Sequence, residues 1–258
     1  MQYERHCFRV SQIIVLLLST ESNVQGDWID TFDGGFDQTW NFIGVDSATS
    51  LSPSETYNES TAGNILTPTL PTNAGGPEFH FGYVDETFTD VRVSATASGV
   101  GTGHDVNVLA RGNPATLSAY AFGVDDIASP GAPAGLVAIA RVQNLAYQVI
   151  ATGVIPDYET VTDYFLEFTV IGNQLSGTVY SDATRSTELV SIGVMDSTLT
   201  SGVSGVSVSS NHLGDTPLSG TFDNVSASAI PEPSSMMFLS LGLATAFGMR
   251  RRWKVFCS

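Results

Sequence analysis

The sequence predicts an all-β protein, a two-sheet antiparallel β-sandwich of the jelly-roll type, and three observations support this fold class. No stretch between residues 27 and 230 keeps apolar residues at helical spacing over several turns. Apolar and polar residues instead alternate with a period of two in short runs. Clusters of Gly, Pro, Asn and Asp separate these runs, as turns separate the strands of a sandwich or barrel.

The clearest alternation runs through Val91–Ala97, Val106–Arg111 and Tyr164–Val170. The last run meets Gly172-Asn173 and continues to Val179, which predicts a hairpin with a tight turn. The stretch from 50 to 77 is rich in Ser, Thr, Pro and Asn, so we expect a long surface loop with one or two strands. Further strands are expected at residues 78–84, 118–124, 136–142, 145–151, 188–194, 203–209 and 221–228.

The charge distribution limits what the chain binds. Ten basic residues stand against 26 acidic ones, so phosphates would be repelled and nucleic-acid binding is disfavoured. Residues 27–230 contain 23 acids, four arginines and no lysine, a net charge of −19. Both cysteines, Cys7 and Cys257, lie outside this stretch, so the domain must be stabilised by its core rather than by disulfides.

Residues 1–26 have the order of a secretory signal peptide. Arg5 and Arg9 precede a short apolar run at residues 13–18, and Val24-Gln25-Gly26 places small or aliphatic residues before a cut at Asp27. The alternative is a buried strand or helix of the domain. The run is too short to span a bilayer, which favours export.

Residues 231–254 form a second candidate targeting segment. Pro231, Glu232 and Pro233 precede a charge-free apolar stretch, Met236–Met249, and then the basic cluster of Arg250, Arg251 and Arg252. This order resembles the PEP-CTERM sorting signal of Gram-negative bacteria that make exopolysaccharide. The resemblance implies an exosortase, a membrane-embedded cysteine protease or transpeptidase, as partner, with processing near the Pro-Glu-Pro and delivery from the inner membrane to the cell surface or extracellular matrix.

The physical properties of this tail agree with a transient stop in the membrane. As a helix, Met236–Met249 would cover about 21 Å, short of the roughly 30 Å hydrocarbon core. The basic cluster would remain cytoplasmic by the positive-inside rule, which leaves the domain outside. An ordinary tail anchor without processing is the alternative.

The order of segments in residues 27–230 resembles the concanavalin A-like, laminin-G-like jelly roll. In such folds the first and last strands pair, which implies that Phe32 and Phe222 come together. The resemblance rests on Asp30-Thr31-Phe32-Asp33 with Trp40, on Val106–Arg111 and Tyr120–Val124, on the hairpin at Gly172–Leu175, and on Gly202–Val206 leading to Phe222–Val225.

No motif for catalysis is apparent in the sequence. Glycosidases on this scaffold need two carboxylates roughly 5–10 Å apart, and the Glu-x-Asp-x-x-Glu pattern of laminarinase-type relatives is absent. In a strand, Asp163 and Glu167 would lie about 13 Å apart, and Asp125 and Asp126 would point to opposite faces. The histidines lack metal-ligand spacing.

Calcium is the metal that the composition favours, because hard cations bind carboxylates and carbonyls. Asp30, Asp33 and Asp37 surround Gly34-Gly35, and Asp223 in the last strand could join them. The alternative is an acidic turn whose aspartates accept hydrogen bonds from local amides.

The sequence therefore predicts a non-enzymatic, exported surface or matrix protein. Its ligand, if one binds, would be a polysaccharide, with tyrosines and tryptophans stacking on sugar rings where they are exposed. Core packing is the alternative role of those aromatic residues. A glycan hydrolase or lyase on the same scaffold is the alternative function.

Overall fold

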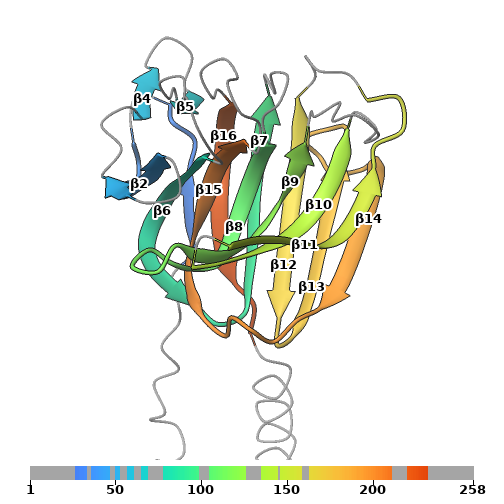
Figure 1. Ribbon diagram of the computed structural model, residues 1–258. Coiled ribbons are helices and arrows are strands. Elements are labelled where there is room, and N and C mark those ends of the chain that lie inside the picture. Colours follow the sequence, from blue (N-terminus) through green and yellow to red (C-terminus); the bar gives the residue numbers. More distant parts are fainter. Residues whose placement is uncertain are drawn as a thin grey trace, which may run out of the picture.

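The computed structural model describes residues 27–33, 36–46, 50–52, 57–60, 65–68, 78–98, 105–125, 135–144, 146–158, 163–210 and 220–231. Within these residues the chain forms sixteen β-strands in two antiparallel sheets that lie face to face (Figure 1). The two-sheet all-β prediction is confirmed. The predicted signal peptide, the predicted helix at 236–249 and the basic cluster lie outside the described residues. No helix in the described part of the chain is long and apolar enough to cross a membrane.

We call the first sheet sheet A. Its hydrogen-bonded order is β14-β13-β12-β7-β16-β5-β4, and β1 also pairs with β16. The pairing of β1 with β16, Trp28 opposite Ala227, confirms that the first and last strands are neighbours. The strands are β1 (Trp28–Asp30), β4 (Tyr57–Ser60), β5 (Ile65–Pro68), β7 (Val91–Ser98), β12 (Tyr164–Ile171), β13 (Gln174–Tyr180), β14 (Glu188–Met195) and β16 (Thr221–Ala229).

Sheet B has the order β11-β10-β9-β8-β15-β6-β2-β3. Its strands are β2 (Trp40–Asp46), β3 (Ser50–Ser52), β6 (Glu78–Phe88), β8 (Asp105–Asn113), β9 (Ser118–Asp125), β10 (Leu136–Gln143), β11 (Ala146–Val154) and β15 (Gly202–Ser210). The predicted strands from residue 78 onward all coincide with observed ones. The stretch from 50 to 77 contains three short strands, β3, β4 and β5, so the expectation of one or two was too low.

The core lies between the two sheets, where alternate side chains of each strand meet. Phe122 of sheet B stacks on Phe168 of sheet A with ring centroids 5.7 Å apart. A side chain on Gly177 would come within 2.2 Å of the Phe122 ring, so the glycine gives this ring its space. Phe32 and Phe222 are both buried in this one cluster, which agrees with the expected approach of the opening and closing strands.

The face of sheet B that points away from sheet A also carries a buried cluster, and we call it the outer face of sheet B. Phe81 of β6, Leu109 of β8, Ala121 of β9 and Val142 of β10 belong to this second cluster. Because these residues alternate with inward-facing ones, strands such as β10 are buried on both faces, as their two-sided apolar sequence predicts.

The two ends of the sandwich differ. At one end the connections between strands are two to six residues long, at residues 89–90, 114–117, 144–145, 172–173 and 196–201. We call this the exit end, because β1 begins and β16 finishes there, in the lower part of Figure 1. At the opposite end, the loop end, the connections are six to ten residues long, at 99–104, 126–135, 155–163, 181–187 and 211–220.

Candidate functional site

The corner where β16 finishes is the point from which the predicted sorting signal leaves the sandwich. The backbone N–H of Ala229 donates to the Asp27 carboxylate over 2.9 Å. The next N–H, of Ile230, donates to the carbonyl oxygen of Asp90 over 3.1 Å. Pro231 follows and is exposed. The first residue after the predicted signal cut and the last residue before the Pro-Glu-Pro therefore lie at the same corner.

Arg111 fixes this corner from inside the sandwich. Its side chain is only 2% exposed, and burial lowers the pKa of its guanidinium despite the nearby Asp90 carboxylate. The guanidinium donates to the carbonyl oxygens of Thr89 (2.6 Å), Gly172 (2.7 Å) and Leu199 (2.9 Å). It also donates to Asp90 Oδ1 over 3.1 Å. One side chain thus joins three connections of the exit end, and Asp90 joins them to Ile230.

A second polar cluster holds the 196–201 connection. Asp196 accepts hydrogen bonds from the Tyr120 hydroxyl (2.6 Å) and from Arg141 (2.6 Å). Partial burial would raise the pKa of Asp196, but these bonds, those from Thr198 and the Arg141 charge together lower it. The Tyr120 hydroxyl in turn accepts the backbone N–H of Leu199 over 3.0 Å. Both carboxylates of the exit-end connections are therefore neutralised by arginine.

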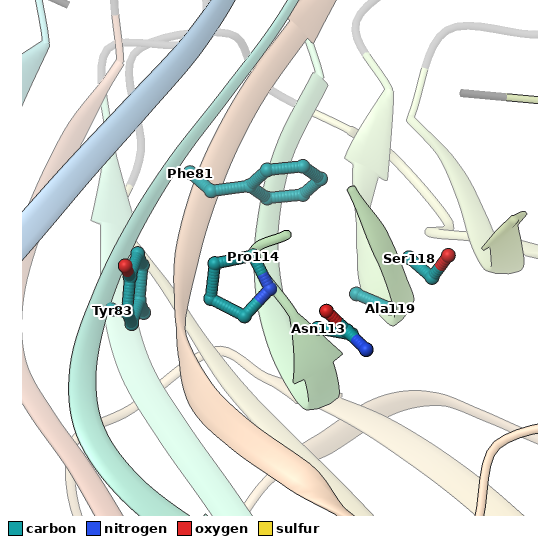
Figure 2. A pocket seen from close by; sticks show the side chains of 6 residues that line it. All are labelled: Phe81, Tyr83, Asn113, Pro114, Ser118 and Ala119. Carbon is teal, nitrogen blue, oxygen red and sulfur yellow. The ribbon is translucent and has the colours of Figure 1, made fainter. Parts of the chain in front are cut away.

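The outer face of sheet B contains a shallow hollow between β6, β8 and β9 (Figure 2). Its volume of about 20 Å³ accommodates roughly one water molecule, whereas sites for small molecules usually hold about 300–1,000 Å³. Burial, and then the charge of Asp85, raise the pKa of the Tyr83 hydroxyl, so that hydroxyl stays neutral at physiological pH. The hollow is lined by Phe81, Tyr83, Asn113, Pro114, Ser118 and Ala119.

A polar row crosses the same face beside the hollow. Asn107 donates its side-chain amide to Ser209 over 3.4 Å, and Ser209 donates its hydroxyl to Asp105 over 3.1 Å. All three side chains are buried. In the register of β8 and β9, Asp125 is the cross-strand partner of Asp105. Sequence spacing did not reveal this pair, because the two residues come from different strands.

The aspartates predicted to bind calcium are placed differently from one another. Asp30 is fully buried, and its carboxylate accepts the backbone N–H groups of Phe32 (3.0 Å), Asp37 (3.1 Å) and Gln38 (3.1 Å). It also accepts the indole N–H of Trp40 over 2.8 Å. Asp30 therefore organises the turn that leads to Trp40, which is the alternative role that the sequence left open.

The calcium site predicted from Asp30, Asp33, Asp37 and Asp223 stays a prediction. Among the residues that the structure describes, no three His, Cys, Asp or Glu side chains are placed to hold a metal ion. Asp223 is close enough to Asp33 and Asp163 for their charges, together with its own burial as the largest cause, to raise its pKa. Asp30 uses its oxygens on four N–H donors, which favours the role of this residue in the turn.

Two other residues considered from the sequence have structural roles. Glu167 forms ion pairs with Arg185 (2.5 Å) and Arg92 (3.7 Å) on the face of sheet A that points away from sheet B. His80 is buried, and burial lowers its pKa to about 4. Of the sorting residues, Pro231 is described, whereas Glu232, Pro233 and Arg250, Arg251 and Arg252 lie outside the described residues.

Arg111 and Asp90 were missed by sequence reasoning. Arg111 was visible only as one of four arginines between residues 27 and 230, at the end of a predicted strand. Its rarity in so acidic a chain was the available signal, since a lone cation among many carboxylates tends to be paired. The three carbonyl oxygens that it binds come from distant turns and leave no pattern in the sequence.

The comparison with protein families finds one match. Residues 229–252 match the PEP-CTERM protein-sorting motif. The match begins at Ala229, the last residue of β16. No curated protein sequence matches the chain.

Solved structures similar to this chain share its fold at low sequence identity. A native glycosidic hydrolase matches with a TM-score of 0.56 and 10% identity, over 79% of this chain and 96% of that one. A β-1,3-1,4-glucanase (lichenase) from a mouse hindgut metagenome matches with a TM-score of 0.52 and 12% identity, over 79% and 99%.

A lectin has the same fold as these two enzymes. Lectin I-B4 from Griffonia simplicifolia, in its metal-free form, matches with a TM-score of 0.50 and 11% identity, over 79% and 98%. Identities this low show the fold alone. The chain thus carries a PEP-CTERM sorting motif at its C-terminus, behind a β-sandwich with the concanavalin A-like fold of lectins and glucanases.

Proposed function

We propose that the protein is exported, processed near Pro231-Glu232-Pro233 by an exosortase-type enzyme, and delivered from the inner membrane to the cell surface or extracellular matrix. The observation that carries this proposal is the sorting motif at residues 229–252. The motif implies export. The signal peptide (1–26) would direct export, the sandwich (27–230) is the domain delivered, and the sorting signal (231–254) would direct processing.

The geometry of the exit corner supports processing after folding. Among the residues that the structure describes, Ile230 makes the last backbone hydrogen bond to the sandwich, one residue before Pro231. All sixteen described strands lie between Trp28 and Ala229. Removal of the chain after Pro231 would therefore leave every described strand and every described core residue in place.

Alanine replacement of Pro231, Glu232 and Pro233 tests the sorting step. We expect the variant to remain in the inner membrane at its unprocessed mass, because the recognition element is gone while the apolar stretch remains. Replacement of Ser234 and Ser235 by alanine is the matched control and should be processed normally. Surface delivery of the triple variant at processed mass would show that the motif is not what sorts this chain.

We propose further that the sandwich is not an enzyme and that its outer face of sheet B binds polysaccharide. The hollow is shallow, and it sets Phe81 and Tyr83 beside polar groups of β8 and β9. An aromatic ring beside hydrogen-bonding groups suits the apolar face and hydroxyls of a sugar ring. The proposed binding surface, the outer face of sheet B around the hollow, is therefore an open platform rather than a deep cleft.

A glycan array with the full-length protein in detergent tests the platform. We expect Tyr83→Ala to abolish binding of the polysaccharides that the parent protein retains. Tyr180→Ala removes a tyrosine of similar partial exposure from the far side of sheet A and should leave binding unchanged. Equal loss in both variants, or no change in Tyr83→Ala, would argue against the platform.

A glycan hydrolase is the second candidate, and the register of β8 and β9 favours it. Cross-strand partners have Cα atoms about 4.5–5.5 Å apart, and carboxylates roughly 5–10 Å apart serve glycoside hydrolysis. Asp105 and Asp125 are such partners. Release of reducing ends from a polysaccharide by the parent protein, lost in Asp105→Asn and Asp125→Asn, would replace the binding proposal with this one.

A further inference from the structure

We propose that the exit end is a membrane-facing surface, which rests on the phospholipid headgroups while the sorting signal holds the protein in the bilayer, and that the loop end points away from the membrane. This inference rests on the proposed function in one respect, the insertion of Met236–Met249 in the membrane. It adds an interaction surface and an orientation that the sorting motif does not specify.

The segment between the sandwich and the apolar stretch, which we call the tether, is short. Ile230 is held by Asp90, and the apolar stretch begins at Met236, so five residues separate the sandwich from the hydrocarbon. Fully extended, five residues span at most about 17 Å. The headgroup layer takes up roughly 5–8 Å of this distance on one side of the bilayer. The exit end must therefore lie within about 10 Å of the lipid surface.

The connections of the exit end carry few unpaired charges. The five connections of the exit end contain two charged residues, Asp90 and Asp196, and each is paired with an arginine. Asp27 at the start of β1, and Asp85 and Glu86 near the end of β6, carry further described carboxylates close to this end, and Glu232 follows in the tether. A domain that carries a net charge of −19 between residues 27 and 230 thus turns toward the bilayer connections whose two carboxylates are both paired with arginine.

The loop end has the opposite composition. The described residues of its five connections contain three acids, Asp157, Asp163 and Asp182, and one arginine, Arg185. Charges within a Debye length, about 8 Å at physiological ionic strength, feel an anionic lipid surface. Only the orientation with the exit end down keeps the acid-rich connections out of that layer.

Two apolar side chains are exposed beside the exit end. Met195 is 62% exposed and Ile171 is 37% exposed. Both are register partners of Gln174, so they lie in one row across β12, β13 and β14 at the last position before the exit-end turns. Two apolar side chains at this position can enter the headgroup layer without desolvating a charge.

Hydrogen bonds from Arg111 fix the shape of this surface. Arg111 joins the 89–90, 172–173 and 196–201 connections through buried hydrogen bonds. The same turns carry the neutral residues that would face the lipid. A fixed surface lets a five-residue tether set one orientation of the whole sandwich.

The test uses the full-length protein reconstituted in nanodiscs whose lipids include one with a paramagnetic gadolinium-chelate headgroup. Amide relaxation in NMR spectra then reports proximity to the lipid surface. We expect the amides of Asn173 and Thr200, at the exit end, to relax several-fold faster than those of Ala183 and Ser186, at the loop end. Equal enhancement at the two ends, or the reverse order, would overturn the orientation.

A charge variant and its matched control sharpen the result. The double variant Ile171→Glu with Met195→Glu should weaken the exit-end enhancement in anionic lipids and recover it in high salt, while the short tether still keeps the exit end near the bilayer. The double variant Val154→Glu with Ala183→Glu adds the same charge at the loop end, where Val154 is 44% exposed, and should leave the enhancement unchanged. The same loss in both variants would mean that net charge alone matters and that the exit end has no special contact.

The outcomes separate this inference from the proposed function. Failure of the protein to stay with the nanodiscs would contradict membrane insertion of the sorting signal, and so the proposed function. Retention without exit-end enhancement would contradict the orientation only. Enhancement that appears only when the sorting enzyme is reconstituted together with the protein would show that the exit end contacts the enzyme and not the lipid.

Discussion

The two ends of the sandwich use aspartate in opposite ways. At the exit end, Asp90 is held by the distant Arg111, and its Oδ1 also accepts the backbone N–H of Gly172 over 2.8 Å. At the loop end, Asp182 accepts hydrogen bonds from the backbone N–H groups of residues 184, 186 and 187 in its own turn. These bonds, with those from the Thr184 and Ser186 hydroxyls, lower the pKa of Asp182 strongly.

The exit end is therefore stabilised by long-range contacts and the loop end by local ones. A turn organised by its own aspartate forms without the rest of the fold. The exit end forms only when β6, β8, β12 and β14 are already in place, because Arg111 reaches all of their connections. Damage at the exit end should therefore destabilise the whole domain, whereas damage at the loop end should remain local.

The largest expected effect is that of Arg111→Ala. It leaves the buried Asp90 carboxylate without its cation and three partly buried carbonyl oxygens without their donor, and breaking a buried pair in this way costs about 3–5 kcal/mol. The melting temperature of a domain of this size should fall by roughly 10 °C. Arg111 and the control residue Arg185 both have a positive φ, +52° and +55°, so backbone strain does not confound the comparison of their alanine variants.

Arg185→Ala is the matched control for this variant. Arg185 is half exposed and bonds to Glu167 and Ser94 at the surface of sheet A. An exposed ion pair contributes at most about 1 kcal/mol, so the melting temperature should move by no more than a few degrees. Equal losses in the two arginine variants, measured by calorimetry, would refute the proposed difference between the ends.

The second effect in size is that of Gly202→Ala, at the exit end where β15 begins. A Cβ there would lie 2.2 Å from the carbonyl oxygen of Gly112 and 2.5 Å from the carbonyl carbon of Arg111. Both atoms belong to the backbone and cannot rotate away, so we expect a loss of about 1–3 kcal/mol in chemical denaturation. Gly193→Ala meets only an ordinary contact at 3.4 Å and should cost much less.

Most of the fold was predictable, because the period of two survives in nearly every strand. The hairpin at Gly172-Asn173 was located to the residue, since Ile171 and Gln174 are its last register pair. The three short strands between 50 and 77 were underestimated. Strands of three or four residues are too short for a period to become visible among Ser, Thr and Pro.

The calcium hypothesis shows why sites are harder to predict than strands. Three aspartates around two glycines fit a hard-cation site and an aspartate-organised turn equally well in one dimension. The indole N–H of Trp40, ten residues after Asp30, donates to the Asp30 carboxylate and so favours the turn, and this contact could not be foreseen from spacing. The pairing of Asp105 with Asp125 went unseen for the same reason, since register is a property of the folded sheet.

The third prediction concerns the pH dependence of stability, with opposite signs at the two ends. The folded-state pKa of Asp196 is lowered, so its contribution is present above the ordinary aspartate pKa and is lost as the pH falls through the folded value. The folded-state pKa of Asp223 is raised, so this carboxylate destabilises the fold above its raised pKa, and acidification relieves that cost.

Thermal unfolding from pH 7 to pH 3 checks this pair. Asp196→Asn should lower the melting temperature at pH 7 and converge with the parent protein in acid. Asp223→Asn should raise it slightly at pH 7, with the gain disappearing as the pH falls toward the ordinary aspartate value. Shifts of the same sign in the two variants at pH 7 would show that the carboxylates of the two ends are not in different electrostatic environments.

The smallest effect should come from Asp27→Ala, which tests the corner where both chain ends meet. The lost acceptor leaves the N–H of Ala229 to water, at a cost below about 1 kcal/mol because the site is exposed. Hydrogen exchange at Ala229 should accelerate several-fold, whereas exchange at Ile230 should stay slow because its acceptor belongs to the Asp90 backbone. Asp37→Ala removes the same charge from another exposed position and should change neither rate. If both amides accelerate together in Asp27→Ala, the end of β16 frays as a unit, and Asp90 alone does not hold the point from which the sorting signal departs.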